Sequence, residues 1–129
     1  MSSDSEEREI AYAGNSNKVL DSWPKDVREM VKTNLQALQS SRVSGFSDLP
    51  DWGGSGKLTD KELNGKKFEG SRQLTIKDKN SYRVAYIAEF EGFVVVLHCF
   101  TKQKEGRQNK DLNTVVERLK HARDRFDNK

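Results

Sequence analysis

The residues of this chain that are best suited to chemistry are arginines and lysines, which gather in two stretches. Residues 57–83 carry eight Lys or Arg against four Asp or Glu, and residues 102–125 show the same count. Residues 1–9 carry four acids against one arginine. The net charge of only +3 is therefore distributed unevenly along the chain, with an acidic start and two basic stretches. Clustered cations favour a polyanionic partner, while a solvated surface is the alternative interpretation. Arginine is also well suited to clamping a phosphate through two parallel hydrogen bonds.

Two arginines are the leading candidates for a phosphate contact. Arg83 follows Tyr82 in a largely apolar stretch, so its charge must emerge on a sheet surface or be paired. Arg72 lies in a neighbouring expected strand and is the second candidate. For both residues a structural ion pair is the alternative role.

Several further cations lie close to the ends of expected elements. Lys102 and Lys104 follow an apolar stretch, and their two-residue spacing places both on one side if the strand continues. The other candidates for binding a polyanion are Lys57, Lys61, Lys66, Lys67 and Arg107. A solubilising loop and a solvated basic turn are the alternatives for these residues.

The two histidines and the single cysteine predict neither a metal site nor a disulfide. His98 lies among apolar residues and is expected to be buried and hydrogen-bonded, while His121 is expected on the surface of the last helix. One cysteine and two scattered histidines do not form a metal site. Cys99 has no partner for an internal disulfide, which fits a reducing compartment, and we expect a cytoplasmic protein.

Other functional classes are disfavoured by what the sequence lacks. No apolar run approaches the roughly 20 residues that span a bilayer, and the acidic start does not resemble a signal peptide. The glycine-rich run 53–57 lacks the first glycine and the final Ser or Thr of a phosphate-binding loop, because Asp51 and Leu58 stand there. We therefore expect no nucleotide site and no membrane contact.

Helices are expected towards both ends of the chain. Apolar residues recur at three- and four-residue spacing over 24–39, and a similar stripe runs over 112–126, with Asn109 as the expected cap. A short helix is expected at 18–22. These stripes are typical of core-facing helices rather than ligand sites.

Between the helices the pattern changes to strands. Strands are expected at 9–13, 72–77, 81–88 and 93–100. The stretch 93–100 is apolar on both faces and should be a central strand, whereas 40–66 is expected to be a long polar loop. This order predicts an α+β domain with helices packed on one face of a mainly antiparallel sheet of four to five strands.

The length of 129 residues fits one domain. Because hydrophobic residues make up only 33% of the chain, the core must be concentrated in a few segments. We expect residues 1–8 to form a disordered acidic tail and residues 9–126 to form the single folded domain.

The stretch 82–102, with the sequence YRVAYIAEFEGFVVVLHCFTK, closely resembles one family. It is similar to the HigB-like, phage-related branch of the RelE/ParE toxin superfamily, whose signature is a Tyr-Arg-Val strand followed by an apolar strand ending in Leu-His-small-Phe. The segments 23–28 and 70–74 also resemble the family's first long helix and the strand before its meander. The resemblance extends over roughly residues 9–126.

This resemblance implies a compact microbial RNase-like (RelE-like) fold and a toxin that pairs with a cognate antitoxin, expected to be a helix-turn-helix protein. Such toxins cleave mRNA, usually on the translating ribosome, without a metal or cofactor. The implied catalytic residues are Arg83, Arg72 and Lys102, and the other cations named above would bind RNA. Two alternatives remain: a non-enzymatic toxin that binds a protein such as DNA gyrase, as ParE-like relatives do, and a repurposed phage-derived binding protein.

The sequence departs from the family pattern at the site itself. Family members usually carry an arginine at the position of Thr75, so this chain lacks that contact or supplies it from elsewhere. The turn that is usually Lys-Lys reads Lys102-Gln103-Lys104 here. The acidic N-terminal extension and the long loop 41–66 are also atypical. No residue in the sequence identifies itself as the general base.

Overall fold

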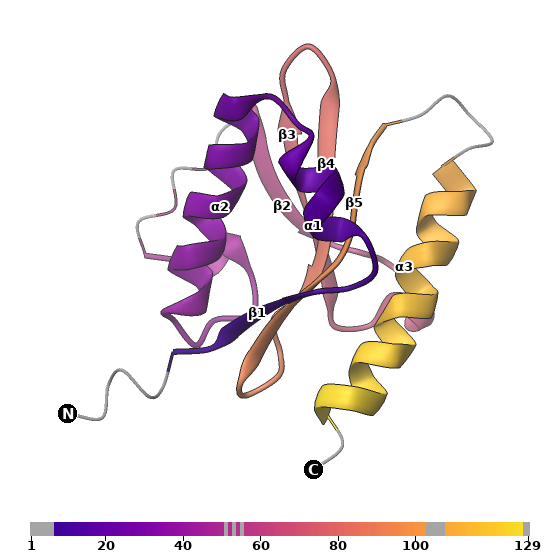
Figure 1. Cartoon of the computed structure of the whole chain (residues 1–129). Helices are drawn as coiled ribbons and strands as arrows, with labels where there is room; N and C mark the ends of the chain where they lie inside the picture. The colour runs from indigo at the N-terminus through magenta and orange to yellow at the C-terminus, as the bar shows by residue number, and fades with distance from the viewer. Residues whose placement is uncertain (1–6, 51, 53, 55, 103–107, 128–129) are drawn as a thin grey trace.

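The computed structural model describes residues 7–50, 52, 54, 56–102 and 108–127. In chain order the elements are β1 (Glu9–Tyr12), α1 (Ser16–Asp21), α2 (Lys25–Gln39), a 3₁₀ turn η2 (Phe46–Asp48), β2 (Leu58–Glu62), a 3₁₀ turn η3 (Lys66–Phe68), β3 (Ser71–Lys77), β4 (Ser81–Ile87), β5 (Phe93–Thr101), α3 (Gln108–Ala122) and a π-helical turn η4 (Arg123–Asp127). Figure 1 shows their arrangement.

The strands form one sheet in the order β1-β5-β4-β3-β2. Strand β1 pairs in parallel with β5, and every other neighbouring pair is antiparallel. The apolar stretch 93–100 therefore becomes the inner strand β5, with neighbours on both sides. The α+β class, the mainly antiparallel sheet and the helices at both ends of the chain confirm the predicted fold, which is compatible with a RelE-like domain.

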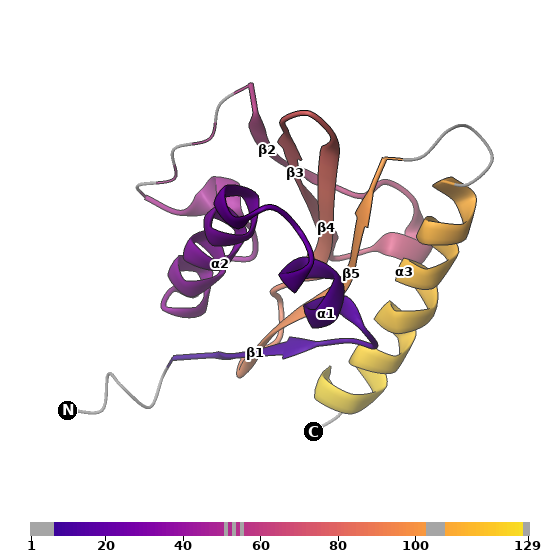
Figure 2. The ribbon, with the colours of Figure 1, turned by 45° about the horizontal axis from the view of Figure 1, so that its top comes forward.

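Helices cover both faces of the sheet, whereas the sequence predicted cover on one face only. Helices α1 and α2 lie on one side and α3 on the other, as Figure 2 shows most clearly. The reason is β5, whose alternating residues are apolar in both directions and need cover on both sides. We call the side under α1 and α2 the α2 face, with core residues Leu74, Tyr82, Val84, Tyr86, Val94 and Val96. The opposite side is the α3 face, with core residues Ala85, Ile87, Val95, Leu97 and Phe100.

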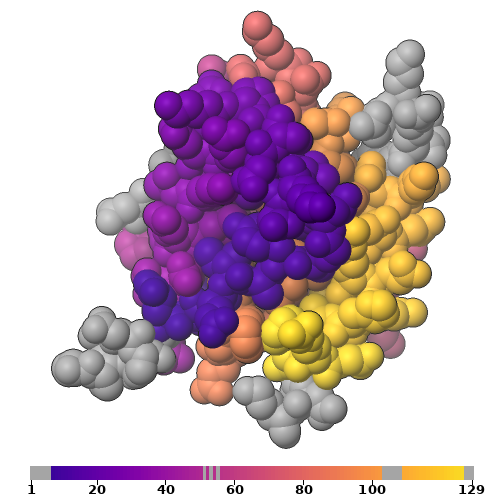
Figure 3. Space-filling model, in the orientation of Figure 1, coloured from indigo at the N-terminus to yellow at the C-terminus, as the bar shows by residue number. Residues whose placement is uncertain are grey.

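Helix α2 follows directly from its apolar stripe. Val27, Val31, Leu35 and Leu38 are buried, because residues three and four apart share one side of a helix. Met30, which belongs to the same predicted stripe, is the exception at 38% exposed. Figure 3 shows α1 and α2 as an unbroken layer over the sheet, beyond which the β3–β4 hairpin projects.

A β-bulge interrupts the pairing of β4 with β5. Ala85 pairs with His98, but Tyr86 pairs with Val96, so Leu97 is the extra residue. A bulge lets two successive residues point to the same side. Leu97 packs in the α3-face core and His98 contacts α3, so both side chains lie on that face.

Three sequence predictions were wrong in detail. The expected loop 40–66 contains strand β2, whose residues are too polar to suggest a strand. Asn109 lies inside α3 rather than capping it. Arg8, placed in the expected tail, is buried and donates hydrogen bonds to the carbonyl oxygens of Ala88 and Leu38, each at 2.7 Å. Residues 1–6 of that tail lie outside the described residues.

None of the described helices is both long enough and apolar enough to cross a membrane.

Candidate functional site

Part of the α3 face carries no helix. Helix α3 packs mainly on β5 and η3, and its buried residues share a core with Ala85 and Ile87 of β4, whereas no residue of β3 or β2 belongs to that core (Figures 1 and 2). On the α2 face the described core residues are covered by α1 and α2, and a hollow of about 720 Å³ opens at its edge beside Glu62 and Arg72. The uncovered part of the α3 face is therefore the surface on which exposed polar side chains of the central strands can meet a ligand. We call it the open face.

Arg83 lies on the open face. It alternates with Val84, whose side chain is buried in the α2-face core, and it pairs with Thr75 on β3 and with Phe100 on β5. Its side chain makes no hydrogen bond or ion pair with any described residue, and its Nε is buried without a partner. The alternative role of a structural ion pair is thus not observed among these residues. An unpaired, partly buried guanidinium is poised to accept an anionic ligand.

The strands bring other polar residues to the same face. Lys102 donates its backbone N–H to Ser81, which extends the ladder beyond Phe100 and places the exposed Lys102 side chain diagonally opposite Arg83. Thr75 stands directly beside Arg83, and its Oγ1 accepts a hydrogen bond from Gln73 at 3.3 Å. The position at which the family usually has an arginine is therefore adjacent to Arg83 in space. Lys61, which pairs with Gln73, lies on β2 at the edge of this face.

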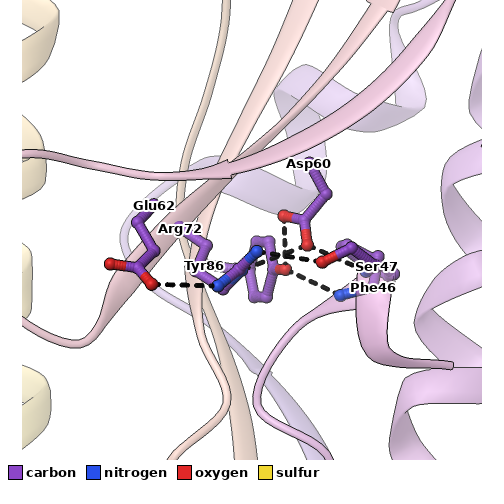
Figure 4. Close-up of polar contacts among 6 residues, drawn as sticks. All are labelled: Phe46, Ser47, Asp60, Glu62, Arg72 and Tyr86. Carbon is purple, nitrogen blue, oxygen red and sulfur yellow. Dashed lines mark hydrogen bonds and ion pairs between the residues drawn. The ribbon is translucent and has the colours of Figure 1, made fainter.

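Arg72 is on the other side of the sheet, so it does not join Arg83. Its Nε donates to Asp60 at 3.1 Å and its guanidinium also contacts Ser47 and Glu62, as Figure 4 shows. The Asp60 side chain is completely buried. Arg72 therefore serves as the partner of a buried charge. The sequence analysis ranked Arg72 second to Arg83 for the same phosphate contact, and the structure places the two on opposite faces of the sheet.

Asp60 is the centre of a closed network on the α2 face. Its carboxylate also accepts hydrogen bonds from the Tyr86 hydroxyl at 2.7 Å and from the backbone N–H of Ser47 at 3.0 Å (Figure 4). The Tyr86 oxygen in turn accepts the N–H of Phe46. Burial, together with the negative charge and hydrogen bond of Asp60, raises the pKa of Tyr86 above its ordinary value. The network thus holds β2, β3, β4 and η2 together.

A second polar group joins β5 to α3. The Nε2 of His98 lies 2.8 Å from Oδ1 of Asp111, and the Nδ1 lies 3.3 Å from Nη1 of Arg118. Because a guanidinium can only donate, Nδ1 must be the acceptor and the proton must be on Nε2, which donates to Asp111. Both ring nitrogens are then engaged, which confirms the predicted hydrogen bonding, although the side chain, expected to be buried, is 13% exposed.

The remaining predicted cations are dispersed. Lys66 and Lys67 of η3 lie with Lys120 and Arg123 around a hollow of about 510 Å³, which Glu69 and Glu89 also line. Lys57 is exposed and precedes β2. Lys104 and Arg107 lie outside the described residues. The structure therefore brings Arg83 and Lys102 onto one face and leaves the other described lysine candidates at its margins.

Sequence reasoning missed two acidic residues and an arginine that the structure makes important. Asp60 lay in a presumed loop, so nothing in the sequence marked it as buried. The positions of Asp111 and Arg118 could have been predicted to lie on one side of the last helix, because residues seven apart on a helix share one side. Tyr82 and Tyr86 are buried on the α2 face, so neither ring is presented on the open face.

Comparison with protein families identifies a match over most of the chain. The family described as phage derived protein Gp49-like (DUF891) matches residues 18–120. This family is known as a toxin type of toxin–antitoxin systems. Comparison with curated proteins and with solved structures finds no match.

Proposed function

Because this chain belongs to the Gp49-like family of phage-derived proteins, we propose that it is the toxin of a toxin–antitoxin module and that it cleaves mRNA. Within the toxins we place it in the HigB-like branch of the RelE/ParE superfamily, from the match of residues 82–102 to that branch's pattern. The observation that carries the proposal is the unpaired guanidinium of Arg83 on the open face.

The proposed chemistry attacks a phosphate of RNA with the neighbouring 2′-hydroxyl. Such a reaction needs cations for the charge that grows on the phosphate oxygens, a base for the hydroxyl and an acid for the leaving oxygen. Arg83 would clamp the scissile phosphate, and Lys102 would stabilise the same charge from the next strand. Arg72 is not part of this site, because its guanidinium already neutralises Asp60.

The partners of this function would be mRNA, the ribosome on which it is translated, and a cognate antitoxin. Lys57, Lys61, Lys66 and Lys67, together with Lys104 and Arg107, would contact RNA phosphates around the open face. Binding through such contacts weakens steeply as salt rises. We expect the antitoxin to be a small helix-turn-helix protein encoded beside this chain.

The test is induced expression in a bacterial host with mapping of mRNA 5′ ends. Wild type is compared with Arg83→Ala and with Arg125→Ala, which removes an exposed arginine from the end of the C-terminal helix. We expect new cuts within translated frames for wild type and Arg125→Ala, and none for Arg83→Ala. Growth arrest without cuts would contradict the proposal and indicate a bound protein target such as gyrase.

A further inference from the structure

We propose that Asp111 is the general base of the cleavage reaction, held in place by His98 and Arg118. The inference rests on the proposed function and supplies the group that the sequence did not identify. In this arrangement Asp111 would contact the reacting hydroxyl, while His98 and Arg118 are positioning residues that act through it.

The Asp111 carboxylate has one committed oxygen and one available oxygen. Oδ1 accepts the hydrogen bond from His98, and no described residue donates to Oδ2. The side chain is 20% exposed in the first turn of α3, so a ligand can reach it. This differs from Asp60, whose two oxygens are both occupied and whose side chain is sealed from solvent.

Arg118 fixes the orientation of the histidine, which in turn orients the carboxylate. Its Nη1 donates to the carbonyl oxygen of Leu97 at 3.0 Å and to Nδ1 of His98. It also donates to the side-chain oxygens of Asn15, just before α1, and Ser16, the first residue of α1, which anchors the guanidinium from a third element. Because Nδ1 is held as an acceptor, the proton of the imidazole stays on Nε2 and points at Asp111.

The β-bulge places this group beside Arg83. It turns His98 onto the α3 face, where the imidazole stacks on Phe100 with 5.0 Å between ring centres and 19° between planes. Phe100 is the cross-strand partner of Arg83. His98 and Arg83 are therefore diagonal neighbours, a relation that puts side chains roughly 7–8 Å apart. Phe100 therefore lies between Arg83, its cross-strand partner, and His98, which stacks on it and holds Asp111.

The proposed step is balanced without a further reactant. Oδ2 of Asp111 accepts the proton of the ribose 2′-hydroxyl as the 2′-oxygen forms a bond to phosphorus. The bond from phosphorus to the 5′-oxygen breaks, and that oxygen takes a proton from solvent. The products are a 2′,3′-cyclic phosphate and a 5′-hydroxyl, and the proton on Asp111 is later returned to water. Arg83 stabilises the charge on the phosphate oxygens during this step.

The test measures cleavage of an mRNA that contains a mapped cut, with purified ribosomes, for wild type, Asp111→Asn and Asp124→Asn. Asp124 is an exposed carboxylate at the end of the same helical segment and serves as the matched control. General base catalysis contributes roughly 10²- to 10⁴-fold to a rate. We expect Asp111→Asn to lower kcat by that factor and to leave KM nearly unchanged, while Asp124→Asn behaves as wild type.

The positioning role is tested with two variants of His98. His98→Gln keeps an N–H that can donate to Asp111, so it should retain more of kcat than His98→Ala, with thermal unfolding curves confirming that both variants fold. Equal loss in the two variants would contradict the positioning role. If Asp111→Asn cleaves at the wild-type rate while Arg83→Ala is inactive, the general base assignment is wrong and the proposed function stands. If wild type cleaves no RNA, both are wrong.

Discussion

Arg72 and Arg83 look alike in the sequence and have opposite surroundings in the fold. Each lies in a strand of the same hairpin, but Arg72 points to the α2 face and pairs with Tyr86 in register, while Arg83 points to the α3 face and pairs with Thr75. Arg72 meets a buried carboxylate, and Arg83 meets none among the described residues. Arg72 stabilises the fold by neutralising Asp60, whereas the charge of Arg83 is not neutralised by any described residue.

The difference between the two arginines shows that the role of a polar side chain depends on which face of the sheet it occupies. On the α2 face the Asp60 side chain is sealed from water, so its carboxylate must find hydrogen-bond donors within the protein. On the open face a guanidinium can remain unpaired because solvent or a ligand completes it. A mutation in the first region should therefore reduce stability, and a mutation in the second should reduce function.

The largest effect on stability is expected from Asp60→Ala. The change leaves the buried Tyr86 hydroxyl, the Ser47 N–H and the Arg72 guanidinium without their acceptor. Removing one partner of a buried ion pair destabilises proteins by about 3–5 kcal/mol. Urea unfolding followed by circular dichroism measures the loss. Glu62→Ala is the control, because that carboxylate also contacts Arg72 but is 77% exposed, and its removal should change stability little.

Arg83→Ala is expected to have little effect on stability and a large effect on cleavage. Since Arg83 has no partner among the described residues, its loss should shift the urea midpoint only slightly, and the removal of an unpaired buried Nε offsets part of any packing loss. Cleavage should fall by about 10²- to 10³-fold, the usual cost of removing one donor that stabilises transition-state charge. If Arg83→Ala lowers the urea midpoint as much as Asp60→Ala does, Arg83 is a structural residue and the contrast between the two faces is wrong.

The sequence predicted the fold better than it predicted the site, and the reason is physical. Apolar periodicity marked α2, β4 and β5 because each buries a regular set of side chains. Strand β2 was missed because it is an edge strand with a polar sequence, held by Asp60 rather than by an apolar run. The face of each arginine depends on register, which only the pairing of β3 with β4 fixes. The face occupied by His98 depends also on the β-bulge in β5, which the sequence pattern did not predict.

A smaller effect, with a distinctive pH dependence, is expected from Tyr86→Phe. The change removes one buried hydrogen bond to Asp60, which should cost about 1–3 kcal/mol because the acceptor is charged. Burial and Asp60 raise the pKa of Tyr86 from its ordinary value of 10.0. The folded chain therefore keeps a proton that the unfolded chain loses above about pH 10, and the stabilisation is lost as pH rises through that range.

The measurement for this variant is the unfolding free energy from pH 7 to pH 11, with Tyr82→Phe as the control. Wild type and Tyr82→Phe should lose stability above about pH 10 along parallel curves, and the Tyr86→Phe curve should be flatter there. A Tyr86→Phe curve parallel to that of wild type would show that the hydroxyl is not the titrating group. It would also weaken the description of the α2 face as a closed network.

The smallest effect is expected from single lysines outside the two arginine sites. Lys66 is exposed and has no ion-pair partner among the described residues, whereas Lys32 on α2 pairs with Asp21 at 2.9 Å on the opposite side of the molecule. If RNA lies across the open face, Lys66→Ala should lower the slope of log affinity against log salt by roughly 0.7, the contribution of one single-strand phosphate contact. Lys32→Ala should leave the slope unchanged. Fluorescence anisotropy with a labelled RNA oligonucleotide over a salt series distinguishes the two, and equal slopes for both variants would place the RNA elsewhere on the surface.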